Sequence, residues 1–236
     1  MIKDIGIIGV IQARMGSTRV PGKALLDLAG KPLLWHIVDR MRRVKHIKKI
    51  VLATSASPEN NVLREFAEKN GIGFYAHPGE DDIAGRVSGA IKNLHGDFIL
   101  KTGGDCPLID PDVLQKIVDL GINAGNADFV SNRVEWSYPL GLSADLISRY
   151  GIEWADKNLS SPKDREFFAL YIRDHKKQFN VIPCKNDIDL SHHAWTVDEP
   201  EDVGFMQSIF EELYREGEVF GMSDVLRFLE QTESKK

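Results

Sequence analysis

Three cationic side chains, Arg14, Arg19 and Lys23, lie close together in residues 12–25, a segment that contains no acidic residue. The whole chain, by contrast, has a formal net charge of -5. Arginine binds phosphate oxygens through a planar fork of donors, and lysine offers a compact positive charge. A solvated turn is the simpler interpretation, but this combination of cations favours a loop that binds an oligophosphate.

Small and hydroxyl-bearing residues accompany these cations. Gly16 and Gly22 permit close approach of the backbone, and Ser17 and Thr18 add hydroxyl donors. Backbone N–H groups in such a turn can also bind an anion. The segment matches neither G-x-G-x-x-G nor G-x-x-x-x-G-K-[ST], which excludes the dinucleotide fingerprint and the P-loop. Its three cations and one divalent metal would together offset the charge of a triphosphate.

Two aspartates further along the chain are candidates for holding that metal. Asp105 lies in TGGDCPLIDP after a predicted strand, and Asp198 lies in WTVDEPED before a predicted helix. Taken singly, each has an ordinary interpretation, as a turn residue or as a helix cap. Mg²⁺ prefers one or two carboxylates together with substrate phosphates. Jointly with the cationic loop, the two aspartates therefore predict a Mg²⁺ site, and Asp110 and Asp112 are weaker candidates.

The apolar pattern predicts strands and helices that alternate along the chain. Strands are expected at residues 5–11, 49–55, 73–76, 97–102 and 127–132, with helices at residues 32–41, 58–71, 83–94 and 111–125. This order predicts a three-layer α/β fold with a mostly parallel sheet. Ligands bind at the carboxyl ends of such strands, so the loops after Ile11, Thr54, Thr102 and Asn132 should converge.

After residue 132 the alternation weakens. We expect a helix at residues 163–175, a strand at 179–183, a further strand at 192–197 and a helix from Pro200. This part should fold back onto the same sheet and help to bind a second substrate. The sequence therefore predicts one domain over residues 1–236.

Composition narrows the class of protein. Of the 236 residues, 42% are hydrophobic and 28% charged, which is typical of soluble globular proteins. The acidic balance argues against a nucleic-acid partner. We expect no membrane association, because no apolar run approaches the ~20 residues that a bilayer span needs. The amino-terminal residues lack the layout of a secretory signal, and Cys106 and Cys184 have no metal-like spacing, so we expect a cytoplasmic protein.

The segments QARMGSTRVPGKALLDLAGKPLL, GGDCPLIDP and WTVDEPED, in this order, resemble the cytidylyltransferase family. The similarity is to the spore coat polysaccharide biosynthesis protein F type, with CMP-Kdo and CMP-N-acetylneuraminate synthetases as relatives, and extends to about Tyr214. It implies a glycosyltransferase-A-like, Rossmann-type fold of the nucleotide-diphospho-sugar transferases. The implied reaction transfers CMP from CTP to a sugar or sugar acid, with release of pyrophosphate, in the synthesis of surface polysaccharide precursors. Residues 1–132 would form the nucleotide-binding core and residues 133–236 the acceptor-binding, sheet-completing part; related enzymes are commonly homodimers.

The resemblance also implies roles for individual residues. Those expected to act in catalysis are Arg14, Lys23 and Asp105, and Mg²⁺ would be bound by Asp105 and Asp198. Residues expected to contact the nucleotide are Ala13, Arg14, Gly16, Ser17, Arg19, Lys23, Thr54, Ser55, Arg86 and Asp105. Residues expected to contact the acceptor are Tyr138, Arg165 and Glu166.

Two segments depart from the family pattern. Where the spore-coat type has a stretch like Y-P-D-G-L-D-x-E, this chain has YPLGLSAD, with Leu140 and Ser143 in place of acids. Where relatives have R-E-H-V-T, this chain has REFFA, with Phe167 and Ala169 in place of histidine and threonine. The nucleotide motifs are intact, so these changes predict a different acceptor or a different way of binding it.

Other residues and other functions give competing interpretations. Cys106 is expected to pack rather than react, and adjacent His192 and His193 should point to opposite faces of a strand and share no metal. Trp136 and Tyr138 could stack on a sugar or simply pack. Three further functions remain open: a nucleotidyltransferase that uses another NTP, a sugar transferase that uses a finished nucleotide sugar, and a non-catalytic binding or assembly protein with the same fold.

Overall fold

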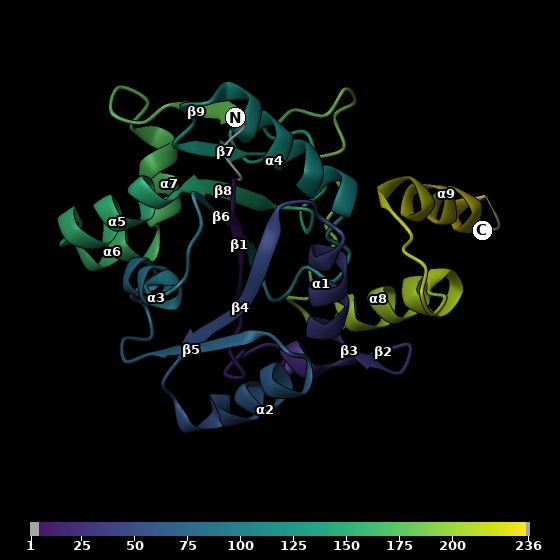
Figure 1. Cartoon of the computed structure of the whole chain (residues 1–236). Coiled ribbons are helices and arrows are strands. Elements are labelled where there is room, and N and C mark those ends of the chain that lie inside the picture. The colour runs from purple at the N-terminus through teal and green to yellow at the C-terminus, as the bar shows by residue number, and fades with distance from the viewer. Residues whose placement is uncertain (1–4, 235–236) are drawn as a thin grey trace.

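The computed structural model describes residues 5–234, and its centre is a seven-stranded sheet (Figure 1). β8 pairs antiparallel with both of its neighbours, and every other pairing in this sheet is parallel. The predicted mostly parallel sheet is therefore confirmed. In spatial order the strands are β5 (Gly73–His77), β4 (Ile47–Ser55), β1 (Ile7–Gln12), β6 (Phe98–Gly103), β8 (Ala144–Ser148), β7 (Phe129–Ser131) and β9 (Val181–Pro183).

Helices cover both faces of the sheet and give the predicted three layers (Figure 1). Alternate residues of β1 contribute to the two cores: Ile7 and Ile11 pack in one, Ile8 and Val10 in the other, and all four are fully buried. This burial on both faces explains the continuous apolar run. On the first face lie α1 (Leu33–Arg42), α2 (Asn61–Lys69), α4 (Pro111–Ala124), α8 (Pro200–Leu213) and α9 (Met222–Glu233). On the second lie α3 (Ile83–Ile91), α5 (Arg149–Asn158) and α7 (Phe168–Asp174).

The first part of the chain follows the predicted order of strands and helices. The helix expected at residues 58–71 begins as a 3-10 turn, η2 (Pro58–Asn60), before α2. A second 3-10 turn, η1 (Lys23–Leu25), and a small hairpin of β2 (Asp27–Leu28) and β3 (Lys31–Pro32) join β1 to α1. These short elements bring the cationic segment back toward the sheet before α1 begins.

The second part differs from the prediction in several elements. The expected strand at residues 192–197 is wrong, because this segment makes only an isolated bridge between Leu140 and Ala194. The helix expected at residues 163–175 is broken at Phe167 into α6 (Pro162–Glu166) and α7. The apolar pattern did not predict β8, α5 or α9. Because β8 inserts between β6 and β7, this part of the chain completes the sheet.

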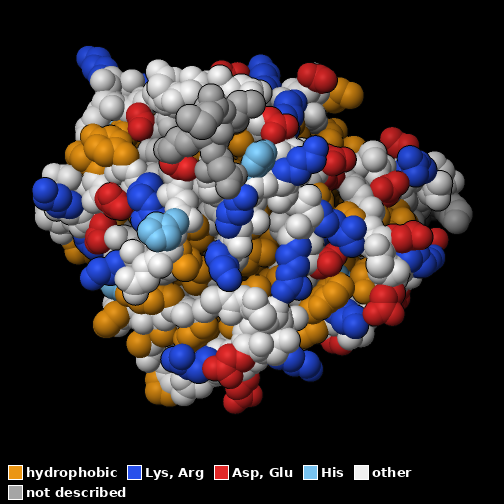
Figure 2. Space-filling view, in the orientation of Figure 1, with side chains coloured by type: hydrophobic (Ala, Val, Ile, Leu, Met, Phe, Trp, Pro, Cys, Tyr) orange, Lys and Arg blue, Asp and Glu red, His pale blue; other side chains and the backbone are white. Residues whose placement is uncertain are grey.

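The surface is mixed in charge. On the face drawn in Figure 2, basic and acidic side chains are interspersed and separated by apolar atoms. Within residues 5–234, no helix has the length and apolar character required to cross a lipid bilayer.

Candidate active site

A cleft of about 540 Å³ opens at the carboxyl ends of the central strands. Its walls come from residues 12–24, the segment around the start of α3, the loop after β6 and the junction of α6 and α7. Arg133, just after β7, and Asp198, just before α8, complete the lining. The predicted convergence of the loops after β1, β6 and β7 is therefore confirmed, whereas the loop after β4 does not line the cleft.

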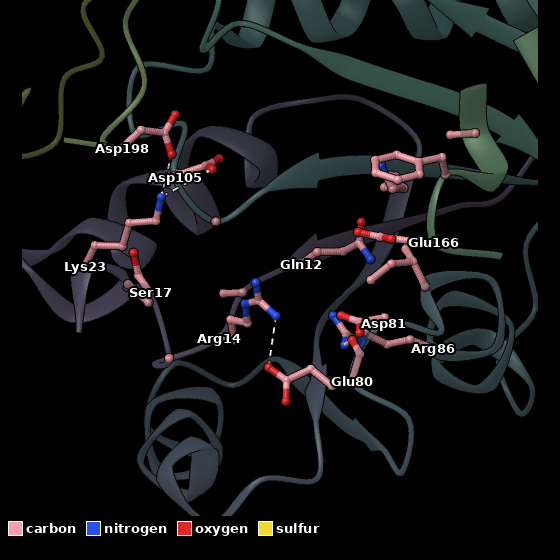
Figure 3. A pocket seen from close by; sticks show the side chains of 18 of the residues that line it. Gln12, Arg14, Ser17, Lys23, Glu80, Asp81, Arg86, Asp105, Glu166 and Asp198 are labelled. Carbon is pink, nitrogen blue, oxygen red and sulfur yellow. Dashed lines mark hydrogen bonds and ion pairs between the residues drawn. The ribbon is translucent and has the colours of Figure 1, made fainter. Parts of the chain in front are cut away.

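The cationic segment is fixed by bonds from its own backbone. Met15 N–H donates to Asn60 Oδ1 at 2.8 Å, and Gly22 N–H donates to Met15 O at 3.1 Å. Gly22 has φ of 73°, a conformation that favours glycine, and directly precedes η1. Lys23 therefore begins a rigid turn, and its side chain points back into the cleft (Figure 3).

Lys23 meets both predicted metal-binding aspartates at one end of the cleft (Figure 3). Its Nζ lies 2.8 Å from Asp198 Oδ1 and 3.5 Å from Asp105 Oδ2, and donates to Val197 O at 2.6 Å. A backbone bond from Val197 N–H to Asp105 O, 3.0 Å long, holds the two loops together. Gly104 lets the Asp105 loop approach the end of β1, because a Cβ there would lie 2.9 Å from Gln12 O. Residues distant in sequence thus form one compact charged group.

The charges in this group stabilise one another. Burial acts to raise the pKa of Asp198, but hydrogen bonds from Lys23 and Thr196 and the charges of Lys23 and Arg19 hold it below its ordinary value. Arg19 also pairs with Glu199. Burial raises the pKa of the Cys106 thiol, as does the charge of Asp105, which accepts a bond from Cys106 Sγ at 3.2 Å. A neutral, buried thiol agrees with the predicted packing role of Cys106.

The other end of the cleft contains buried donors with no acceptor. Among residues 5–234, Gln12 Nε2 and Arg86 Nε are buried atoms without a hydrogen-bond partner. Both side chains line the cleft, near Glu166 and Asp81 (Figure 3). Burial, and next the charge of Arg14, lowers the pKa of Arg86. Unsatisfied buried donors are costly, so they indicate contacts that a bound ligand would supply.

A cluster missed by the sequence analysis lies beside these donors. Lys101 on β6 and Arg133 both line the cleft and both pair with Asp145 on β8, which is 1% exposed. Burial opposes ionisation of Asp145, but the charges of Arg133 and Lys101 lower its pKa to about 2. Two signals could have found the cluster. Lys101 interrupts an apolar strand, and Asp145 stands at the final acidic position of the family stretch in YPLGLSAD.

Most of the expected site residues line this cleft, but several do not. Those that line it are Ala13, Arg14, Gly16, Ser17, Arg19, Lys23, Arg86, Asp105, Glu166 and Asp198. Thr54 and Ser55 are buried outside the lining, and Ser55 Oγ accepts from Asn60 Nδ2 at 2.9 Å.

Two expected acceptor residues also have their polar groups engaged elsewhere. Tyr138 is 4% exposed and accepts from Lys116 Nζ at 3.3 Å, so it packs rather than offering a stacking face. Arg165 pairs with Asp82 at 2.9 Å and Asp156 at 2.7 Å and ties α6 to α3. Neither side chain lines the cleft; Glu166, the third residue expected to contact the acceptor, does.

Comparison with known proteins identifies the family of this chain. A sequence model of the cytidylyltransferase family matches residues 8–138, more than half of the chain. The chain therefore belongs to the cytidylyltransferase family. The matched region includes the cationic segment and Asp105, while Asp198 and the α6–α7 wall lie beyond it.

Individual relatives cover different parts of the chain. An uncharacterized protein, MJ1063 of Methanocaldococcus jannaschii, is 32% identical over 75% of this chain and 70% of its own. The spore coat polysaccharide biosynthesis protein SpsF of Bacillus subtilis is 26% identical over 87% and 86%. A 3-deoxy-manno-octulosonate cytidylyltransferase of Trichlorobacter lovleyi is 32% identical, but over only 48% of this chain and 44% of its own.

Solved structures confirm the predicted fold. A cytidylyltransferase from Leptospira borgpetersenii superposes with a TM-score of 0.88 at 26% identity, covering 98% of this chain and 95% of that one. A CMP:2-keto-3-deoxy-manno-octonic acid synthetase, solved with CTP, gives 0.68 at 16% identity, covering 89% and 100%. The second similarity shows a shared fold only.

Proposed function

We propose that this chain is a Mg²⁺-dependent cytidylyltransferase that transfers CMP from CTP to a sugar or sugar acid and releases pyrophosphate. The observation that carries the proposal is the placement of Lys23, one cation of the loop, between Asp105 and Asp198 inside the cleft. The names of the relatives, a spore coat polysaccharide biosynthesis protein and a 3-deoxy-manno-octulosonate cytidylyltransferase, support an acceptor of this class.

The charge of the cleft suits a nucleoside triphosphate. Although the chain is acidic, the cleft is lined by six basic and five acidic side chains. Arg14, Arg19 and Lys23 would bind the phosphates, with Ser17 as a further donor. If a metal neutralises Asp105 and Asp198, the remaining lining is strongly positive.

The two aspartates are chemically suited to Mg²⁺. Both carboxylates approach one point, which Lys23 Nζ marks, and about a third of each side chain is exposed. No group of three or more His, Cys, Asp or Glu within the described residues could hold a metal by itself. Mg²⁺ is commonly bound by one or two carboxylates together with substrate phosphates, and this pair provides that share. When bound, Mg²⁺ would offset phosphate charge at this end of the cleft.

The protein's own residues would position the substrates and stabilise the leaving group. The acceptor hydroxyl oxygen attacks the α-phosphorus and loses its proton, while the bond from that phosphorus to the bridging oxygen breaks. Charge develops on the departing pyrophosphate, and Arg14, Arg19 and Lys23 are placed to offset it. The free donors of Gln12 and Arg86 would bind and orient polar groups of the nucleotide or acceptor.

Nucleotide binding and pyrophosphate release together test the proposal. We expect CTP with Mg²⁺ to raise the melting temperature more than UTP, ATP or GTP do; equal shifts would contradict a preference for cytidine. We also expect Asp105→Asn to remove nearly all pyrophosphate release with an accepted sugar. Asp112→Asn, an exposed position outside the cleft, is the matched control and should stay active. Full activity in the Asp105 variant would refute this assignment of the site.

A further inference from the structure

The cations Lys101 and Arg133 form a second positively charged group in the cleft, apart from residues 12–25. Arg133 binds Asp145 with two donors, Nη2 to Oδ2 at 2.6 Å and Nε to Oδ1 at 3.3 Å. Lys101 Nζ reaches Asp145 Oδ2 at 3.4 Å, and the Ser131 hydroxyl donates to Oδ1 at 2.7 Å. Asp145 is thereby fully engaged beneath the two cations.

Among the residues that the structure describes, the group has an uncompensated positive charge and N–H donors without an acceptor. Two cations share one carboxylate, so one positive charge is not compensated within the cluster. Within residues 5–234, acceptors are assigned to Nε and Nη2 of Arg133 but not to Nη1. The Lys101 ammonium, which can donate three bonds, has a single assigned acceptor. Both side chains remain accessible, at 14% and 25% exposed, and both line the cleft.

A purely structural role explains this arrangement poorly. The cluster does join the ends of β6, β7 and β8, but apolar residues of similar size could join them at no cost in desolvation. Lys101 follows Ile99 by two residues and so faces the side of the sheet covered by α3, α5 and α7. That side includes the cleft wall at residues 166–170, where Phe167 is 46% exposed. Lys101 therefore faces the same side of the sheet as this wall, which includes most of the REFFA segment that departs from the family pattern.

We propose that Lys101 and Arg133 form an anion subsite, separate from the phosphate loop, that binds a carboxylate or phosphate group of the acceptor. This inference rests on the proposed function, because it concerns the second substrate of that reaction. Glu166 is the exposed acid on the facing wall and would repel an anion placed at the rim. The subsite would select acidic acceptors over neutral sugars and hold them by a group remote from the attacking hydroxyl.

A binding experiment with simple anions tests the subsite directly. The phosphate loop is first filled with Mg²⁺ and the non-hydrolysable analogue of CTP that carries a methylene group between the α- and β-phosphorus. Pyruvate and inorganic phosphate are then titrated separately and followed by NMR. We expect saturable binding of at least one of them to the wild-type complex. The one that binds more tightly identifies the chemistry as carboxylate or phosphate.

Variants determine where the anion binds. Lys101→Gln and Arg133→Gln should each weaken it about tenfold, the usual effect of losing one charge-assisted bond. Arg227→Gln is the matched control: Arg227 is 64% exposed, pairs with Asp224 and lies outside the cleft lining, so this variant should bind normally. The double variant Arg133→Gln, Asp145→Asn removes both partners of the ion pair and should also lose binding, without an unpaired carboxylate in the core.

The outcomes separate the two proposals. If the CTP analogue does not bind to the wild-type chain, the proposed function fails, and the subsite inference fails with it. If the analogue binds but neither anion does, or if anion binding is unchanged in the Lys101 and Arg133 variants, only the subsite is wrong. Pyrophosphate release adds a second criterion. Lys101→Gln and Arg133→Gln should raise the acceptor KM and leave the KM for CTP within about twofold of the wild-type value. If the wild-type chain uses a neutral sugar as efficiently as any acidic one, the inference is overturned.

Discussion

Replacing Lys23 with glutamine should have opposite effects on catalysis and on metal binding. In the structure the Lys23 ammonium neutralises two carboxylates, at 2.8 Å from Asp198 and 3.5 Å from Asp105. In the proposed reaction the same ammonium offsets charge on the departing pyrophosphate. Without it, the reaction loses a cation, and the two carboxylates lose the counter-ion that competes with Mg²⁺.

The distance to Asp198 sets the size of the effect on Mg²⁺ binding. At 2.8 Å, two unit charges interact by about 6 kcal/mol at an effective dielectric constant of about 20, and by about 1.5 kcal/mol in water. The Asp198 side chain is 32% exposed, so solvent screening brings the figure toward the lower value. A gain of about 1.4 kcal/mol would tighten Mg²⁺ binding about tenfold in the absence of nucleotide. Loss of one preorganised donor to developing negative charge typically lowers kcat by about 10²–10³.

Two assays and one control test this prediction. Calorimetry with Mg²⁺ alone measures the metal affinity, and pyrophosphate release at saturating CTP measures kcat. Lys31→Gln is the control, because Lys31 pairs with Glu216 outside the cleft and should change neither quantity. A Lys23→Gln enzyme that keeps more than about a tenth of wild-type kcat would refute the proposed role in catalysis. Weaker Mg²⁺ binding in that variant would refute the competition between ammonium and metal.

Three further predictions concern residues that do not line the cleft. The buried His36 ring donates to Leu28 O at 2.8 Å, and burial lowers its pKa to about 4. Between pH 6.5 and pH 4 the histidine is protonated in the unfolded chain but not in the folded one, so the free energy of unfolding falls as the pH falls. His36→Gln should remove about 2 kcal/mol of the loss between pH 7 and pH 5, measured by urea unfolding. Cys106→Ala should retain at least about half of the activity, since a buried neutral thiol is a poor nucleophile; abolished pyrophosphate release with intact CTP binding would contradict this. Arg165→Ala should release α6 from Asp82, which directly precedes α3, and should raise the acceptor KM. The shift in melting temperature caused by CTP should stay unchanged. A loss of CTP binding as large as the loss of acceptor binding would contradict this.

The grouping of Lys23 with Asp105 and Asp198 could be predicted because most of its signals are local in sequence. Arg14, Arg19 and Lys23 occupy one turn, and Asp105 directly follows a strand that pairs with β1. In a parallel sheet, loops that follow neighbouring strands must lie at the same edge, so strand order alone brings these side chains together. Asp198 also lies at this edge, although the segment before it does not form the predicted strand. The bridge to Leu140 and the bond from Val197 N–H to Asp105 O position Asp198 instead.

The cluster of Lys101, Arg133 and Asp145 could not be predicted in the same way. β8 runs antiparallel to both of its neighbours, and nothing in its short apolar sequence indicates that it inserts between β6 and β7. Only that insertion brings Asp145 between Lys101 and Arg133. Likewise, the family resemblance implied that Thr54 contacts the nucleotide, but its side chain in β4 is fully buried and does not line the cleft. Antiparallel insertions and the depth of a residue within a sheet depend on tertiary packing, which local periodicity does not encode.

The separation of the two cationic groups has a consequence for the reaction. A triphosphate and an anionic acceptor repel each other, and this repulsion is greatest when the attacking oxygen approaches the α-phosphorus. A single merged cationic site would bind either substrate in either position and would favour unproductive complexes. Here Lys23 is paired with Asp105 and Asp198, so in the proposed reaction Mg²⁺ would have to displace that pairing to bind the carboxylates and offset phosphate charge. Lys101 and Arg133, by contrast, are tied to a buried carboxylate that is engaged by four hydrogen bonds, so their excess charge is always available. Phosphate binding should therefore depend strongly on Mg²⁺, whereas binding at the acceptor subsite should not. This difference would let each substrate find its own end of the cleft.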